Sequence, residues 1–243
     1  MNQPALKTTL VILTRNEITG VRHLLERIPL GEVDEYFAID YHSTDGTVEF
    51  FETHGIPVIR QRRPGRAEAF RLAAKKASGQ ILVFFSPDGN EDPRGIPRLI
   101  SMIKKGADLA IASRFMKGSR NEEDHRILKW RAWANQVFTW LANIFFRHSG
   151  PYITDTINGY RAITKTAFRK LDLDAQGFAI EYQMTIRALR LGYRIIEIST
   201  IEGQRLGGQS TAKAIPTGIQ FLGYLLRELR CRRFFSQKQS YSH

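Results

Sequence analysis

Short apolar runs alternate with amphipathic stretches over residues 8–115. The runs are rich in β-branched and aromatic residues and have the length of buried strands. They are Leu10–Thr14, Tyr36–Asp40, Val58–Gln61, Ile81–Phe85 and Leu109–Ala112. The stretches between them, near 18–28, 47–54, 66–77 and 94–105, have the apolar spacing of helices. Because strands and helices alternate, we expect an α/β fold with a mostly parallel central sheet flanked by helices.

The pattern becomes less regular after residue 115. It predicts a long helix within 124–146, a strand over Gly159–Thr164, a helix near 180–191, a strand over Arg194–Ile201 and a last helix over about 214–230. For the helix near 94–105, Asp92 is the expected N-cap and Pro93 lies in the first turn. We expect one domain over residues 1–213, followed by a basic amphipathic helix and tail over 214–243.

Two of these helices combine apolar and basic residues. The segment 126–147 holds all three tryptophans of the chain, interspersed with arginine and lysine. The segment 214–233 has apolar residues at helical spacing and four arginines near its end, Arg227, Arg230, Arg232 and Arg233. Both are typical of helices that lie on an anionic bilayer. Ordinary packing on the sheet, and arginines that stabilise a helix C-terminus, explain the same patterns.

The composition narrows the classes of protein. The formal net charge is +12, which suits a polyanionic partner such as a phosphorylated molecule, an anionic membrane or a nucleic acid, or simply a solvated surface. The single cysteine, Cys231, excludes an intrachain disulfide and a cysteine-rich zinc site. The N-terminal residues do not resemble a secretory signal, and no apolar window reaches the length of a membrane span. We therefore expect a cytoplasmic protein.

Common nucleotide and metal motifs are absent from the sequence. It contains no Gly-x-x-x-x-Gly-Lys-Ser/Thr phosphate loop, no Gly-x-Gly-x-x-Gly after the first strand and no His-Glu-x-x-His. A standard NTPase, a nicotinamide-dependent dehydrogenase or a histidine-based metalloenzyme is therefore unsupported.

Polar clusters instead follow three of the predicted strands. They are Thr14-Arg15-Asn16-Glu17, Asp40 with Ser43-Thr44-Asp45-Gly46-Thr47, and Ser86-Pro87-Asp88-Gly89-Asn90. Ligands of open parallel sheets bind beyond the carboxyl ends of the strands, so these clusters predict a binding site there. The alternative is structural: Asn16, Ser43 and Asp45 as helix caps, and Asp88-Gly89 as a turn.

The order of these clusters, continued by later motifs, resembles a family 2 glycosyltransferase of GT-A fold, in the dolichyl-phosphate mannose synthase-like branch. The resemblance covers roughly residues 8–213. The later motifs are Gly65-Arg66-Ala67-Glu68-Ala69, Ser113-Arg114-Phe115, Asp155 with Gly159-Tyr160-Arg161, and Arg205 with Gly208 and Ser210. The chain departs from the family at three positions. Ser86 replaces the first aspartate of the family's Asp-x-Asp metal motif, and Tyr41 and His42 replace Asp and Gly.

The resemblance implies the role of each motif residue. The residues expected at the nucleotide-sugar donor are Thr14, Asn16, Glu17, Asp40, Ser43, Asp45, Gly65 and Arg66. Asp88 and Asn90 are expected to hold Mg²⁺ or Mn²⁺, and Arg66 and Arg205 to carry more of the diphosphate charge because Ser86 lacks a carboxylate. The expected catalytic residues are Asp88, Arg114, Asp155 and Arg205. Arg114 and Arg131 are expected at the acceptor phosphate, with Arg126 as a substitute for Arg131.

The implied reaction is transfer of a hexose-type sugar from GDP-mannose or a UDP-sugar to polyprenyl phosphate, with inversion, by a protein peripherally associated with an anionic membrane. Two alternatives stay within the family: a transferase with a soluble acceptor, and an inactive homologue that binds nucleotide only. The hypothesis that the protein binds nucleic acid is supported by the net charge alone, because the basic residues are dispersed and no nucleic-acid motif is present.

Overall fold

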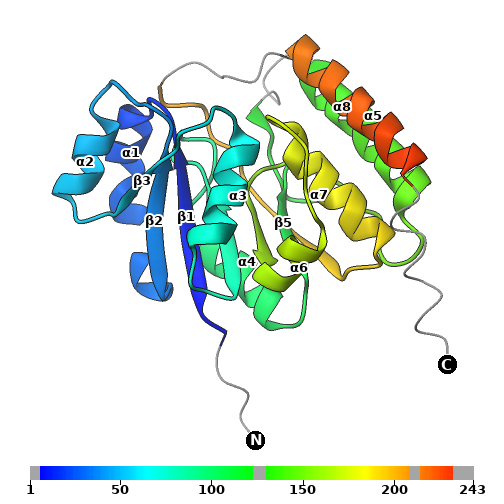
Figure 1. Ribbon diagram of the computed structural model, residues 1–243, viewed down its shortest axis with the longest axis horizontal. Coiled ribbons are helices and arrows are strands. Elements are labelled where there is room, and N and C mark those ends of the chain that lie inside the picture. Colours follow the sequence, from blue (N-terminus) through cyan, green and yellow to red (C-terminus); the bar gives the residue numbers. More distant parts are fainter. Residues whose placement is uncertain (1–5, 123–129, 208–213, 232–243) are drawn as a thin grey trace, which may run out of the picture.

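A computed structural model of the protein describes residues 6–122, 130–207 and 214–231 (Figure 1). These residues form one seven-stranded sheet of order β3-β2-β1-β4-β6-β5-β7. The strands are β1 (Thr8–Thr14), β2 (Glu35–Asp40), β3 (Val58–Arg60), β4 (Ile81–Phe85), β5 (Leu109–Ser113), β6 (Arg161–Thr164) and β7 (Ile195–Ser199). Strand β6 is antiparallel to β4 and β5, whereas every other neighbouring pair is parallel.

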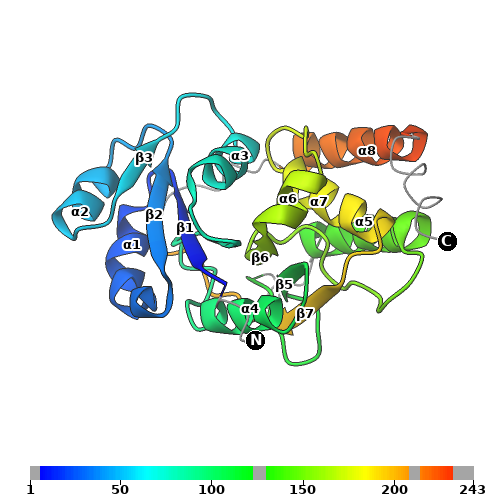
Figure 2. The ribbon, with the colours of Figure 1, turned by 60° about the horizontal axis from the view of Figure 1, so that its bottom comes forward.

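Helices cover both faces of the sheet (Figure 2). They are α1 (Ile18–Leu24), α2 (Thr47–Thr53), α3 (Arg66–Lys76), α4 (Gly95–Lys104), α5 (Trp130–Phe146), α6 (Lys165–Lys170), α7 (Ala179–Arg190) and α8 (Ala214–Arg230), with short 3₁₀ turns at Leu25–Arg27 and Leu30–Glu32. One apolar core joins the sheet to α1, α2 and α4, and the other joins it to α3 and α5–α8. The centre of β1 is a continuous apolar run because Leu10 and Ile12 face the first core and Val11 and Leu13 the second.

The predicted α/β architecture is confirmed, and each predicted strand and helix that lies in the described residues is present. Several predicted bounds differ from the observed ones by a few residues, and one helix start was wrong: α4 begins at Gly95 rather than beside Asp92. The Asp92 carboxylate accepts the N–H of Arg94 at 3.0 Å and pairs with the guanidinium of that residue, so it closes a turn before the helix. The six-residue helix α6 was not expected, since it is too short for a periodic pattern; the Thr164 hydroxyl caps it by accepting the Ala167 N–H.

Helix α8 is attached to the domain through α5 and α7 (Figures 1 and 2). Phe138 of α5, Tyr182 of α7 and Phe221 of α8 form a cluster with ring centroids 5.3–5.7 Å apart. Beside this cluster, the fully buried Glu228 of α8 accepts hydrogen bonds from Arg187 at 2.9 Å and from Gln183 at 2.8 Å, both on α7. A buried ion pair and an aromatic cluster therefore fix the C-terminal helix.

Replacement of Glu228 by alanine is expected to lower the free energy of unfolding by about 3–5 kcal/mol, because Arg187 and Arg190 lose a buried carboxylate partner. Urea denaturation followed by circular dichroism measures this change. Glu26→Ala, at an exposed position, is the matched control and is expected to cost less than about 0.5 kcal/mol. A loss below 1 kcal/mol in Glu228→Ala would contradict the anchoring role.

Candidate functional site

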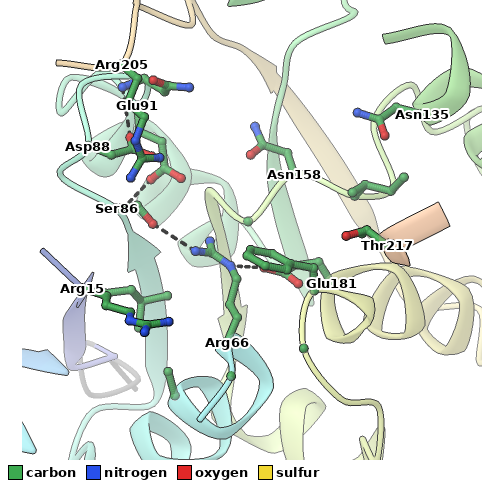
Figure 3. Close-up of a pocket in the computed structure, with 18 of the residues that line it drawn as sticks. Arg15, Arg66, Ser86, Asp88, Glu91, Asn135, Asn158, Glu181, Arg205 and Thr217 are labelled. Carbon is green, nitrogen blue, oxygen red and sulfur yellow. Dashed lines mark hydrogen bonds and ion pairs between the residues drawn. The ribbon is translucent and has the colours of Figure 1, made fainter. Parts of the chain in front are cut away.

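A cavity of about 760 Å³ lies beyond the carboxyl ends of β1, β2 and β4 and extends toward α5, α7 and α8 (Figure 3). Its size is typical of small-molecule sites. The end next to the sheet is polar and includes Glu17, Asp88 and Arg205. The opposite end is largely apolar and includes Phe138, Phe178 and Phe221, together with polar groups such as Asn135 and Thr217.

The loops after β1 and β2 are joined by the predicted polar cluster. Asn16 Oδ1 accepts the N–H of Thr44 at 2.8 Å, and Ser43 Oγ accepts the N–H of Asn16 at 2.8 Å. Asp45 accepts the N–H of Ile18, at the start of α1, and that of Thr47, at the start of α2. None of Asn16, Ser43 and Asp45 is among the residues that line the cavity. Their contacts therefore match the alternative interpretation, in which these residues connect the two loops and accept N–H groups at the starts of α1 and α2.

Asp40 lies behind the cavity wall rather than in it. Only 2% of the residue is exposed, and its carboxylate accepts hydrogen bonds from the Ser43 N–H at 3.0 Å and from the Thr14 hydroxyl at 3.3 Å. Of the predicted donor-binding residues, the structure brings Thr14, Glu17, Gly65 and Arg66 to the cavity.

The cavity wall near β1 and β2 also contains residues to which the sequence assigned no role. The Arg15 guanidinium lies over the Tyr41 ring, with 5.2 Å to the centroid, and Gln61 follows β3. All three line the cavity. Their position directly after β1, β2 and β3 was the available signal in the sequence.

Arg205 forms ion pairs with two carboxylates of the polar end, Asp88 and Glu17. One of its nitrogens lies 2.9 Å from Asp88 Oδ2, and another pairs with Glu17. Burial raises the pKa of Glu17 to about 7, and Arg205 opposes this shift. Burial likewise raises the pKa of Asp88, again against Arg205. The backbone around Arg205 runs along the turn after β4, since the Leu206 N–H donates to the Asp88 carbonyl at 2.9 Å. The motif residues Gly208 and Ser210 lie outside the described residues.

Arg66 enters the cavity from the start of α3. Its guanidinium pairs with Glu181 of α7 and donates to the Ser86 hydroxyl at 3.2 Å (Figure 3). A Cβ atom on Gly159 would lie 1.9 Å from an Arg66 nitrogen. The glycine before β6 is therefore needed for the guanidinium to reach Ser86.

Arg114 is held from behind by Asp155. Its Nε and Nη2 donate to the two oxygens of the fully buried Asp155 carboxylate, at 2.7 and 3.1 Å. Burial alone would raise the pKa of Asp155, but Arg114 lowers it below the usual range. The remaining Arg114 nitrogen lies 3.7 Å from Glu202. Arg114 lines the cavity and Asp155 does not, so the contact of Asp155 with the site is through Arg114.

Arg131 of α5 also lines the cavity, 3.4 Å from Glu122. Arg126 lies outside the described residues. Arg114 and Arg131, the described arginines that were predicted at the acceptor phosphate, therefore share one cavity with Asp88 and Arg205.

The described residues of the cavity wall carry one more carboxylate than arginines, so a bound cation would balance their charge. Among the described lining residues, six carboxylates face five arginines, although the whole chain carries +12. Asn90 Oδ1 and Glu17 Oε2 are buried and have no hydrogen-bond partner there. Oxygen donors of this kind suit Mg²⁺ or Mn²⁺. No group of three or more His, Cys, Asp or Glu side chains arranged to hold a metal occurs in the described residues, so the protein would supply a partial ligand set, as is usual where substrate phosphates complete it.

Comparison with known proteins identifies the family. The model of "Glycosyl transferase family 2" matches residues 9–171. A polyprenol monophosphomannose synthase from Mycolicibacterium smegmatis is 32% identical over 216 residues, which cover 81% of this chain and 77% of that protein. An undecaprenyl-phosphate mannosyltransferase from Micrococcus luteus is 29% identical over 218 residues, covering 82% and 85% of the two chains.

Solved structures support the same fold. Glucosyl-3-phosphoglycerate synthase from Mycobacterium tuberculosis, crystallised with Mn²⁺, UDP and phosphoglyceric acid, superposes with a TM-score of 0.75 at 21% identity, over 93% of this chain and 79% of that one. This likeness confirms the predicted GT-A-type fold. The family match and the 32% identical relative establish that the chain belongs to glycosyl transferase family 2 and is a glycosyltransferase.

Proposed function

We propose that the protein transfers a hexose-type sugar from a nucleotide-sugar to a polyprenyl phosphate. The observation that carries this proposal is the cavity, which joins a polar end at Asp88 and Arg205 to an apolar end at α5 and α8. A diphosphate donor fits the polar end, and a lipid phosphate needs both a cationic and an apolar neighbour. The mannosyltransferases of lipid phosphates to which the chain is similar support the same assignment.

The donor diphosphate would lie between Asp88 and the arginines of the polar end. Asp88 and Asn90 would hold a Mg²⁺ or Mn²⁺ ion, which neutralises the charge that develops on the leaving diphosphate. Arg205 now neutralises Asp88 and Glu17, and its guanidinium would turn to the diphosphate when a donor is bound. Arg66, beside Ser86, adds a second fixed positive charge.

The acceptor phosphate would lie at Arg131 and at the edge of Arg114 that faces Glu202. A phosphate monoester is mostly ionised near neutral pH, since its second pKa is about 6, so its oxygen attacks without a general base. That oxygen forms a bond to the anomeric carbon as the bond from this carbon to the diphosphate oxygen breaks. Attack opposite the leaving group inverts the anomeric configuration. Asp155 orients Arg114 for this step.

The exposed faces of α5 and α8 would bring the protein to the membrane that contains the acceptor lipid. On α5, Trp133, Val137, Trp140 and Ile144 are each more than half exposed and recur at helical spacing. On α8, the exposed apolar residues Ile219, Leu222, Leu226 and Leu229 also recur at helical spacing. In the described residues, no helix is both long and apolar enough to traverse a bilayer. We therefore propose contact with the membrane surface, aided by the charge of +12.

A second candidate is transfer to a soluble phosphorylated acceptor. It is favoured by the structural neighbour that was crystallised with phosphoglyceric acid. This function leaves the exposed stripes of α5 and α8 without a role, and it predicts activity that does not depend on lipid.

The reaction is tested with a panel of GDP- and UDP-sugars and Mg²⁺ or Mn²⁺, offered to polyprenyl phosphate in liposomes and, separately, to 3-phosphoglycerate. A lipid-linked product from one donor is the expected result. Product only with 3-phosphoglycerate would establish the second candidate. Absence of product from every donor, with folded protein, would contradict both and favour a protein that binds nucleotide without transferring sugar.

Asp88→Asn is expected to lower kcat/KM for sugar transfer by at least about 100-fold, because several kcal/mol of charge stabilisation at the diphosphate are lost. Initial rates at limiting donor measure this effect. Asp92→Asn is the matched control: Asp92 is close in sequence, but its carboxylate pairs with Arg94 outside the cavity, and the rate should remain within about twofold. Equal losses in the two variants would argue against a specific role of Asp88.

Replacing Trp133 and Trp140 together by glutamine should weaken binding to anionic liposomes by at least about tenfold, since each indole would otherwise bury apolar surface in the bilayer. Liposome co-sedimentation gives the partition coefficient. Leu6→Ser removes an exposed apolar side chain beside β1, and this control should bind as the unchanged protein does. Unaltered binding of the double variant would exclude α5 as the contact surface.

A further inference from the structure

The turn after β4 brings two carboxylates to the same edge of the cavity. The chain bends back at Pro87-Asp88-Gly89, so that Glu91 Oε2 accepts the backbone N–H of Ser86 at 2.7 Å. Asp88 Oδ1 accepts the N–H of Asn90 at 3.0 Å within the same turn. Both carboxylates line the cavity, and Figure 3 shows Glu91 beside Asp88, above Ser86.

Glu91 differs from the other carboxylates of the cavity in its neighbours. Each of the others pairs with an arginine: Glu17 and Asp88 with Arg205, Glu122 with Arg131, Glu181 with Arg66, and Glu202 with Arg114. Within the described part of the chain, Glu91 has no such ion pair. Two carboxylates therefore lie at one turn and only one of them, Asp88, forms an ion pair, so this turn is suited to binding a further positive charge.

Two oxygen atoms around the turn lack partners as well. Asn90 Oδ1 is buried without a hydrogen bond, and so is Oε2 of Glu17, a residue that is only 8% exposed. Ser86, which begins the turn, provides no carboxylate, and its hydroxyl already accepts from Arg66. Asp88 alone is a weak site for a divalent ion, because Mg²⁺ and Mn²⁺ are held by several oxygen ligands.

We propose that Glu91 is the second carboxylate ligand of the divalent cation, next to Asp88 and Asn90, and that it replaces the carboxylate missing at Ser86. The proposal rests on the proposed function in one respect only, namely that a nucleoside diphosphate and a divalent cation bind together at Asp88. It requires neither a lipid acceptor nor sugar transfer. The bond between Glu91 and the Ser86 N–H holds this carboxylate at residue 86, where the carboxylate is missing.

A purely structural role for Glu91 makes a different prediction. In that case its function is to accept the Ser86 N–H, which the amide oxygen of a glutamine also does. Glu91→Gln therefore keeps the shape and the hydrogen bond of the turn but removes the negative charge. Adding Ser86→Asp to this variant restores a carboxylate beside Asp88 from the other end of the same turn.

The test measures Mn²⁺ binding, by the loss of the electron paramagnetic resonance signal of free Mn²⁺, in titrations of the full chain with saturating GDP or UDP. Glu91→Gln is expected to lower Mn²⁺ affinity at least about tenfold, and Ser86→Asp/Glu91→Gln to return it to within about threefold of the unchanged protein. Asp92→Asn, which removes the next carboxylate in the sequence, is expected to leave the affinity unchanged. Thermal melting verifies that each variant is folded.

Tight Mn²⁺ binding by Glu91→Gln, equal to that of the unchanged protein, would overturn the proposal, and so would absence of Mn²⁺ binding in the unchanged protein. A double variant that is folded and remains as weak as Glu91→Gln would also count against it. If Glu91→Gln does not fold, a crystal structure of the unchanged protein with Mn²⁺ and UDP decides. A Glu91 oxygen bound to the ion supports the proposal, and coordination without Glu91 refutes it. Because no readout involves an acceptor, failure of lipid glycosylation leaves this result intact.

Discussion

The pairing of arginines with carboxylates is the constraint on which the site depends. Arg66, Arg114, Arg131 and Arg205 come from separate parts of the chain, and each is held by at least one carboxylate from another element or loop. A guanidinium in a partly buried cavity needs such a partner. The pairs therefore set where the positive charges stand before any substrate arrives, and they also hold the sheet, α7 and the segment around Arg205 together.

The fold could largely be predicted from the sequence because its strands are buried on both faces and read as continuous apolar runs. The same reasoning placed Thr14, Glu17, Asp88 and Asn90 at the carboxyl ends of strands, and all four line the cavity. It could not separate residues that face the cavity from those that face a neighbouring loop. Asp40 and Asp45 have the right residue type and position, but their oxygens are used by Ser43 and by the starts of α1 and α2.

Other residues were out of reach because their position depends on contacts between distant segments. Glu181 begins α7 and meets Arg66, which is 115 residues earlier in the chain. No periodicity or motif spacing reveals such a contact. The sequence indicates no role for Glu91 for a different reason: a carboxylate three residues beyond Asp88 is expected at the start of α4, and only the bond to the Ser86 N–H shows that the turn folds it back.

The reversed direction of β6 has a consequence for how the site is divided along the chain. An antiparallel strand presents its beginning, not its end, at the edge where the parallel strands finish, so Asn158 and Gly159 reach the cavity just before β6 starts. One excursion between β5 and β6 thus carries Arg114, Arg131, the exposed face of α5 and Asp155. Under the proposed assignment, substitutions or insertions within this excursion would remodel the acceptor wall while the β1–β4 half, with Glu17, Arg66 and Asp88, keeps its framework. The topology would then make acceptor choice separable from donor chemistry.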